Sequence, residues 1–242
     1  MGRVTNLLII ANVAVFLLVF SMPEQLLQAT FDTFDFSAAK MLEAWRWVTT
    51  MFLHGSASHL FFNMIALYFF GRVLESDIGS RKFLLIYFLS GLVGSLVFAL
   101  TSSAPAVGAS GAIFGVMGAS MFCQPKQLIR IYVLPLPLGL VAILFILAQV
   151  ALAAVPLHAS GIAYVAHIGG LVTGSLLMFY MEPKAAFKGF TMILVLLLIL
   201  IVLWPLIGFV VGIGQFILSI LDFIVGFILY NAANLLFSWV WV

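Results

Sequence analysis

The stretch GASGAIFGVMG, from Gly108 to Gly118, places a serine and a set of regularly spaced glycines at the start of one apolar segment. The glycines recur at intervals of three and four residues, so they share one face of a helix. Stripes of small residues let helix backbones approach closely in lipid. A second stretch, AHIGGLVTG from Ala166 to Gly174, has a glycine pair at the same spacing. Close packing of these two segments is what a hydrogen bond between Ser110 and His167 would need.

Composition indicates a membrane protein. The chain of 242 residues is 65% hydrophobic and 7% charged, and its mean hydropathy is +1.28. A soluble domain would have about a quarter of its residues charged. The ten basic residues form no run that could follow a phosphate backbone, so we expect no nucleic-acid partner. The single cysteine, Cys123, excludes an intrachain disulfide framework and is expected to serve packing.

Apolar runs of about 20 residues are long enough to cross a bilayer. They predict helices near 4–20, 59–76, 83–101, 110–124, 128–154, 161–181 and 189–212, with a further apolar stretch at 215–240. The connection 21–58 is too long for a plain linker and is expected to have structure of its own. The predicted fold class is therefore an all-α polytopic membrane protein, with a core in 1–181 and one or two extra apolar helices in 189–242.

The distribution of lysine and arginine predicts the orientation, because positive charges concentrate in cytoplasmic loops. Two basic residues, Lys40 and Arg46, fall in the loops of one side, and eight fall in the loops of the other. The eight are Arg3, Arg72, Arg81, Lys82, Lys126, Arg130, Lys184 and Lys188. We expect a cytoplasmic N-terminus and an outside 21–58 loop. The N-terminal segment lacks the features of a cleaved signal or transit peptide and is expected to be an anchor. The expected location is a prokaryotic plasma membrane.

In this orientation the second, fourth and sixth segments all begin at the outer face, and each begins with polar residues. His59 and Asn63 share a helix face in the second segment, Ser110 opens the fourth, and His167 lies near the start of the sixth. A lone serine in a membrane helix usually serves packing. Ionisable residues in a bilayer more often mark function. Four polar residues expected at one depth favour a site.

The residue types at this depth are those of acyl-transfer chemistry. Serine needs a base to take its proton, and His167 is the candidate. No acidic residue lies at the same depth in the predicted helices, so we expect a dyad. Candidate donors to a developing oxyanion are the Asn63 amide, the His59 ring N–H and the Ser110 backbone N–H at a helix start. No metal motif such as HExxH is present and no cofactor is expected.

These motifs together resemble the rhomboid family of intramembrane serine proteases, over the range Trp45 to Gly174. The residues that carry the resemblance are Trp45-Arg46, His59 and Asn63, Gly71, Glu75 and Gly79, Gly108-Ala109-Ser110-Gly111, and His167 with Gly170 and Gly174. The resemblance implies a six-helix core and a Ser110–His167 dyad. It also implies an oxyanion site of His59, Asn63 and Ser110, and Arg46 as a staple of its loop. Phe114 stands where the family often has a tyrosine stacked on the catalytic histidine.

The resemblance further implies substrates that are transmembrane proteins in the lipid bilayer, cut near the outer membrane face. The oligomeric state is left open. The tail at 215–240 has a narrow polar stripe that includes Asp222, and it is expected either to span the membrane or to lie in its interface. His54 and His158 are expected to be solvated loop residues.

Other functions fit the residues less well. A catalytically silent rhomboid-like binder of transmembrane helices would typically lack the serine or the histidine, and both are present. A transporter would predict an internal repeat around a midplane site, and no such repeat is visible. An aspartyl protease would need two aspartates in apolar segments, and only one is available.

Overall fold

The computed structural model describes residues 2–131, 134–154 and 164–237. The chain divides into two compact units, Met1–Ile193 and Leu194–Val242. In both units the described residues are mainly helical, which agrees with the predicted all-α class.

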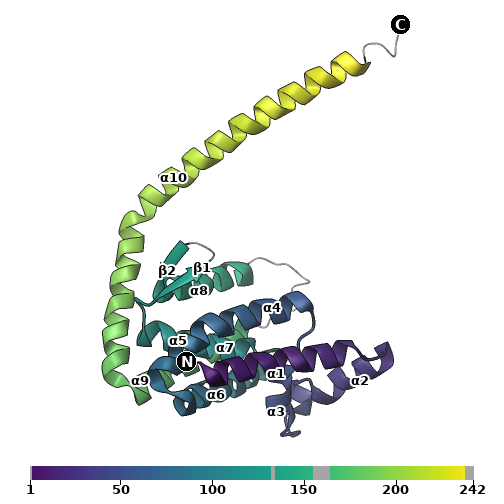
Figure 1. Cartoon of the computed structure of the whole chain (residues 1–242), viewed down its shortest axis with the longest axis vertical. Helices are drawn as coiled ribbons and strands as arrows, with labels where there is room; N and C mark the ends of the chain where they lie inside the picture. Colours follow the sequence, from purple (N-terminus) through teal and green to yellow (C-terminus); the bar gives the residue numbers. More distant parts are fainter. Residues whose placement is uncertain (1, 132–133, 155–163, 238–242) are drawn as a thin grey trace. The chain divides into compact units, whose positions relative to one another are not determined.

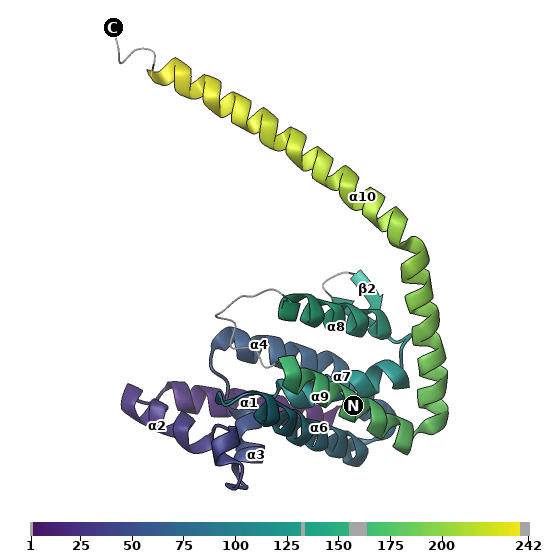
Figure 2. The ribbon, with the colours of Figure 1, turned by 180° about the vertical axis from the view of Figure 1, so that it is seen from behind.

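The first unit is a bundle of membrane-length helices around one short central helix (Figures 1 and 2). Three of its membrane-length segments are single helices, namely α1 (Arg3–Phe20), α6 (Ser80–Thr101) and α9 (Tyr164–Met181). The fourth is made of α4 (Ala57–Ala66), the π-helical turn η3 (Leu67–Gly71) and α5 (Arg72–Ile78), which follow one another without a break. Each of these four membrane-length segments is long and apolar enough to cross a membrane. The chain is therefore an all-α polytopic membrane protein.

The central helix is α7 (Ser110–Cys123), and nearly every residue from Ala112 onward is buried. A helix that is apolar on all sides belongs in an interior. Its closest neighbour is α9. A Cβ added at Gly170 would lie 2.0 Å from the carbonyl oxygen of Gly111, and one at Gly174 would lie 2.0 Å from that of Gly115. Only glycine permits this approach, so the two backbones touch along the stripe.

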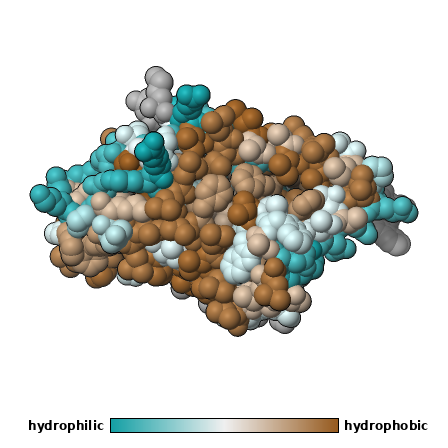
Figure 3. Space-filling view, turned by 90° about the horizontal axis from the view of Figure 1, so that it is seen from below, coloured by the Kyte–Doolittle hydropathy of each residue, from teal (hydrophilic) through white to brown (hydrophobic). Residues whose placement is uncertain are grey.

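The outer surface of the bundle is suited to lipid. On α1, for example, Leu7, Ile10, Leu17 and Leu18 are each more than half exposed. Figure 3 shows a broad hydrophobic band with hydrophilic residues gathered at its two ends. A soluble monomer rarely exposes an apolar area of this extent.

The connection between α1 and α4 has structure of its own, as predicted. It contains α2 (Glu24–Phe34), the 3₁₀ turn η1 (Ala38–Lys40), α3 (Arg46–Thr49) and the 3₁₀ turn η2 (Thr50–Phe52). Arg46, which is 6% exposed, holds it together. Its guanidinium donates to Glu43 Oε2 at 2.8 Å, to the Asp32 carbonyl at 2.7 Å and to the Asp35 carbonyl at 3.1 Å. Loss of one partner of a buried charge is destabilising, because the other partner is left buried without compensation.

The predicted single helix over 128–154 is wrong. Its first part forms an antiparallel hairpin of β1 (Leu128–Ile131) and β2 (Leu134–Pro137), and only then does α8 (Leu138–Ala154) begin. The physical reason is the pair Pro135 and Pro137. Proline lacks the N–H that a helix interior requires, but it is tolerated in an edge strand.

The predicted break near Gly212 and Gly214 is also absent. Helix α10 comprises Pro183–Phe237 without interruption and contains Pro205. In the first unit its start packs at Gly189, where an added Cβ would lie within 2 Å of the Phe122 carbonyl oxygen. In the second unit most described side chains are exposed and apolar, Trp204 and Phe223 among them. In an apolar environment each peptide group needs an intrahelical partner, which favours continuation through glycine.

A single carboxylate links the start of α1 to α5. Glu75, which is 5% exposed, accepts hydrogen bonds from the backbone N–H of Val4 at 2.9 Å and of Thr5 at 2.8 Å. The hydroxyls of Thr5 and Ser80 donate to it at 2.7 and 2.8 Å. The first amides of a helix have no intrahelical acceptor, and their dipoles favour a negative charge. Glu75 therefore caps a helix 70 residues away.

We expect Glu75→Ala to lower the free energy of unfolding by about 2–4 kcal/mol, because four donors lose a charged acceptor at once. Glu75→Gln, which keeps one carbonyl oxygen, should lose less. Thermal unfolding in detergent measures both. The control is Glu24→Ala in α2, where the carboxylate bonds only to exposed Gln28. Equal losses for the two alanine variants would contradict the role of Glu75 as a cap.

Candidate active site

Ser110 is the first residue of α7, and the turn that delivers it depends on Gly108. Gly108 has φ +121°, a conformation that side chains disfavour. A Cβ at this position would also lie 2.7 Å from His59 Cε1 and 3.6 Å from Asn63 Nδ2. The glycine thus brings the loop before Ser110 against the two polar residues of α4.

His167, in the first turn of α9, forms a hydrogen bond with Ser110. The distance from His167 Nε2 to Ser110 Oγ is 2.8 Å. Phe114, one turn along α7, stacks on the imidazole with a centroid distance of 4.3 Å and an interplanar angle of 5°. The ring of Tyr164 meets it edge-on at 6.4 Å. The aromatic rings restrict the imidazole to the plane in which Nε2 faces the hydroxyl.

His59 and Asn63 lie one turn apart on α4. Ser56 caps that helix by accepting from the His59 backbone N–H at 3.2 Å. Asn63 is 8% exposed, so its amide needs a protein partner. It finds one in His54, whose Nε2 lies 3.0 Å from Asn63 Nδ2.

The prediction of a solvated His54 is wrong, because the side chain is 1% exposed. Its ring packs edge-on against His59 with a centroid distance of 5.0 Å. With the Asn63 nitrogen as donor, His54 Nε2 accepts, and the neutral ring has its proton on the buried Nδ1. Burial, with a smaller effect from His59, lowers the pKa of His54 to about 4, which keeps it neutral.

The sequence contains only a weak signal that His54 is buried. It lies five residues before His59, in a segment with Gly55 and Ser56 that reads as an exposed turn. His158, the other histidine expected in a loop, lies outside the described residues.

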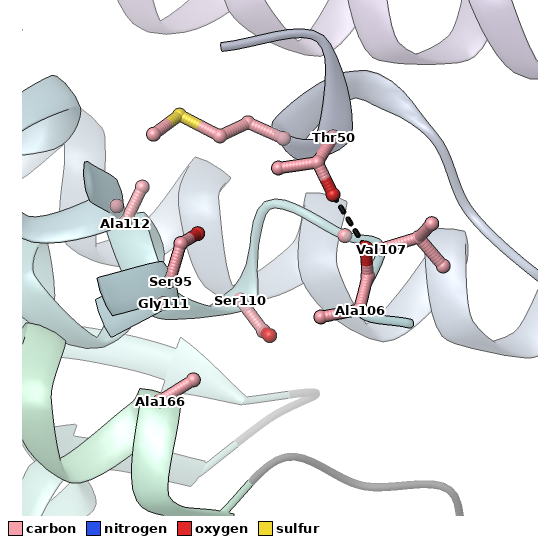
Figure 4. A pocket seen from close by; sticks show the side chains of 11 residues that line it. Thr50, Ser95, Ala106, Val107, Ser110, Gly111, Ala112 and Ala166 are labelled. Carbon is pink, nitrogen blue, oxygen red and sulfur yellow. Dashed lines mark hydrogen bonds between the residues drawn. The ribbon is translucent and has the colours of Figure 1, made fainter. Parts of the chain in front are cut away.

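A cavity of about 30 Å³ lies beside Ser110. Figure 4 shows the residues around it, among them Thr50, Ser95, Ser110 and Ala166. This volume is enough for a water molecule, and the hydroxyls of its lining offer the polar partners that a buried water needs. Within the described ranges no group of histidine, cysteine and acidic side chains could hold a metal ion.

Several residues that the resemblance assigned to the site support the fold. Arg46 lies in the network of the α1–α4 connection, and Trp45, half exposed, donates its indole N–H to the Thr33 carbonyl at 3.3 Å. Glu75 caps α1. Gly111, Gly170 and Gly174 form the contact between α7 and α9.

The residues brought together at the start of α7 can perform one kind of chemistry. A hydroxyl bonded to an imidazole nitrogen can transfer its proton to it and attack a carbonyl carbon. The Asn63 amide lies near Gly108 in the loop before Ser110, and the backbone N–H of Ser110 belongs to a helix start, where the helix dipole favours negative charge.

The family model described as the rhomboid domain matches residues 41–184. The chain belongs to the rhomboid family. Rhomboid protease GluP of Bacillus subtilis (strain 168) is 36% identical over 132 residues, which are 54% of this chain and 25% of that protein. RHOMBOID-like protein 6, mitochondrial, of Arabidopsis thaliana is 39% identical over 152 residues, 61% of this chain and 48% of that protein.

Rhomboid protease GlpG of Serratia proteamaculans (strain 568) is 30% identical over 143 residues, 59% of this chain and 50% of that protein. The chain thus spans between a quarter and half of the length of these relatives. All the residues of the candidate site fall inside the rhomboid domain. The relatives include bacterial and mitochondrial proteins, so membership of the rhomboid family leaves the cellular compartment open.

We expect His54→Leu to lower the free energy of unfolding by about 1–3 kcal/mol, because the buried amide of Asn63 loses its acceptor. His54→Gln should lose less, since its amide oxygen can accept in place of Nε2. Unfolding in detergent at pH 7 measures both.

The same variants give a dependence on pH. The pKa of His54 is about 4 in the folded protein, against 6.5 for a solvated histidine such as that of the unfolded chain. The unfolded chain therefore takes up the proton first, and stability should fall as the pH is lowered from 6.5 towards 4. His54→Gln should show a shallower fall. Identical slopes for the wild type and His54→Gln would contradict a buried neutral His54.

Proposed function

We propose that this rhomboid protein is an intramembrane serine endopeptidase, with Ser110 as nucleophile and His167 as general base. The observation that carries the proposal is the hydrogen bond of 2.8 Å between Ser110 Oγ and His167 Nε2, inside an apolar bundle. Polar residues inside a membrane are energetically costly, so such a pair is taken as a functional site by default. Relatives named as rhomboid proteases, GluP and GlpG among them, support the reaction class.

The reaction proceeds in two stages. Ser110 Oγ attacks the carbonyl carbon of the scissile peptide while its proton moves to His167 Nε2. His167 then gives this proton to the leaving amine, the C–N bond breaks, and an acyl-serine ester remains. Water, deprotonated by His167, attacks the ester, releases the new carboxyl end and restores the Ser110 hydroxyl.

Each tetrahedral intermediate carries a negative oxygen. The donors proposed for it are the backbone N–H of Ser110, the amide of Asn63 and the ring N–H of His59. One N–H of the Asn63 amide is committed to His54, so the other is left for the oxyanion. Donors that are held in place before the reaction stabilise the transition state without the cost of reorganisation.

The proposed substrates are transmembrane segments of other proteins in the bilayer. A membrane helix hydrogen-bonds its own carbonyls, so the peptide to be cut must first leave the helix. Segments that contain glycine near their outer end should unwind more readily, because glycine is a poor helix former. A cut near the outer face follows from the orientation proposed from the basic residues, with a cytoplasmic N-terminus and the α1–α4 connection outside.

We expect Ser110→Ala to abolish cleavage of a fluorogenic transmembrane substrate and labelling by a fluorescent fluorophosphonate. Its free energy of unfolding should change by less than about 1 kcal/mol, because one hydroxyl is removed beside glycines. Ser120→Ala is the matched control. Ser120 lies on the same helix, and its hydroxyl bonds only to the carbonyls of Phe70 and Val116. Cleavage by purified Ser110→Ala protein would rule out the serine mechanism.

The same assays separate the roles of the other residues. His167→Ala should lose cleavage and labelling, because the serine has no proton acceptor. Asn63→Ala should slow cleavage about 10²–10³-fold without abolishing it. If the protein were instead a catalytically silent rhomboid-like binder, the fluorophosphonate would not label the wild type, and the wild type would still bind the transmembrane segment.

We expect single cysteines to report the orientation of the chain. In a Cys123→Ser background, a membrane-impermeant maleimide added to intact cells should label Ser103→Cys and spare Lys184→Cys. After lysis both should react. Labelling of position 184 in place of 103 would invert the protein and place the cut at the cytoplasmic face.

A further inference from the structure

The loop 102–109, which leads into Ser110, is hydrogen-bonded to the α1–α4 connection at two places. The first is an antiparallel bridge, in which Phe36 N–H donates to the Ala106 carbonyl at 3.2 Å and Ala106 N–H donates to the Phe36 carbonyl at 2.7 Å. The second is Thr50. Its carbonyl accepts from Gly108 N–H at 2.9 Å, and its hydroxyl donates to the Ala106 carbonyl at 2.6 Å.

Thr50 therefore bonds to both ends of the turn Ala106–Gly108, once through its backbone and once through its side chain. Figure 4 shows the side-chain bond at the edge of the cavity that Ser110 also lines. Thr50 is 3% exposed, so water does not compete for these groups. The turn that it spans contains Gly108 at φ +121°, the conformation on which the position of Ser110 depends.

The geometry points to Thr50 as a positioning residue for the reaction. Its hydroxyl holds the Ala106 carbonyl, its carbonyl holds the Gly108 amide, and the loop then directs the Ser110 hydroxyl to His167 and the Ser110 N–H to the oxyanion. Thr50 acts through Ala106 and Gly108, and it exchanges no proton with the substrate. This role rests on the proposed function, because it positions the proposed nucleophile.

The neighbouring threonine provides a matched comparison. Thr49 donates its hydroxyl to the Phe34 carbonyl at 3.0 Å, a bond that lies within the α1–α4 connection. Replacement of either threonine by valine keeps the shape of the side chain and removes one hydroxyl bond to a backbone carbonyl. Of the two hydroxyl bonds, that of Thr50 joins the connection to the loop before Ser110, and that of Thr49 does not.

The test compares Thr50→Val, Thr50→Ser and Thr49→Val in the full chain, with kcat, KM and the rate of fluorophosphonate labelling as readouts. Thr50→Val should lower kcat and the labelling rate about tenfold, the equivalent of one buried hydrogen bond, and leave KM within about twofold. Thr50→Ser, which keeps the hydroxyl, should stay within about twofold of the wild type. Thr49→Val should keep both rates, even where its melting temperature falls as far as that of Thr50→Val.

Hydrogen exchange of the segment 104–110 gives a readout that does not need catalysis. Thr50→Val should speed exchange of the Gly108 amide about tenfold, and Thr49→Val should leave it unchanged. Equal kcat in Thr50→Val and wild type, or equal slowing in both valine variants, would overturn the positioning role. The wild type could instead show no cleavage and no fluorophosphonate labelling, while its Gly108 amide is still protected from exchange. That result would overturn the proposed function, and Thr50 would then have no reaction to position.

Discussion

The contact between the backbones of α7 and α9 determines where the polar residues of this protein can meet. Helices in lipid gain little from apolar side chains alone, so close approach depends on small residues. At Gly170 and Gly174 a single added carbon would overlap the carbonyl oxygens of α7. A separation this small is what lets a short serine side chain reach an imidazole on the next helix. With larger residues in the stripe, Ser110 and His167 would be too far apart to bond.

The positions of the first turns of α4 and α7 then depend on the α1–α4 connection. The α1–α4 connection supplies three kinds of support: Arg46 ties its own backbone together, Thr50 holds the loop before Ser110, and His54 holds the amide of Asn63. The connection is built on buried polar groups with defined partners. Such networks specify one arrangement, because any displacement leaves a buried donor or acceptor unsatisfied.

Much of this arrangement was predictable from the sequence. Composition gave the membrane class, and the glycine spacing indicated which helices pack together, because both follow from simple rules of helix geometry and solvation. The spacing of His59 and Asn63 placed them on one helix face. The hairpin of β1 and β2 is not predictable from periodicity, because its apolar run is compatible with either a strand or a helix. The feature that favours strands is the pair Pro135 and Pro137, which a helix interior does not tolerate. The burial of His54 could not be predicted either, because it depends on tertiary contacts that are not visible in a local sequence pattern.

The cap that Glu75 provides has a consequence for the order of assembly. The carboxylate that accepts from the amides at the start of α1 lies about 70 residues further along the chain. Until α5 is in place, these amides have only water as an acceptor, and no carboxylate lies at the positive end of α1. Insertion of the second membrane span, which ends in α5, therefore completes the cap of α1 through a contact of high sequence separation. Such contacts form late, because the intervening chain must lose its freedom before the contact stabilises it.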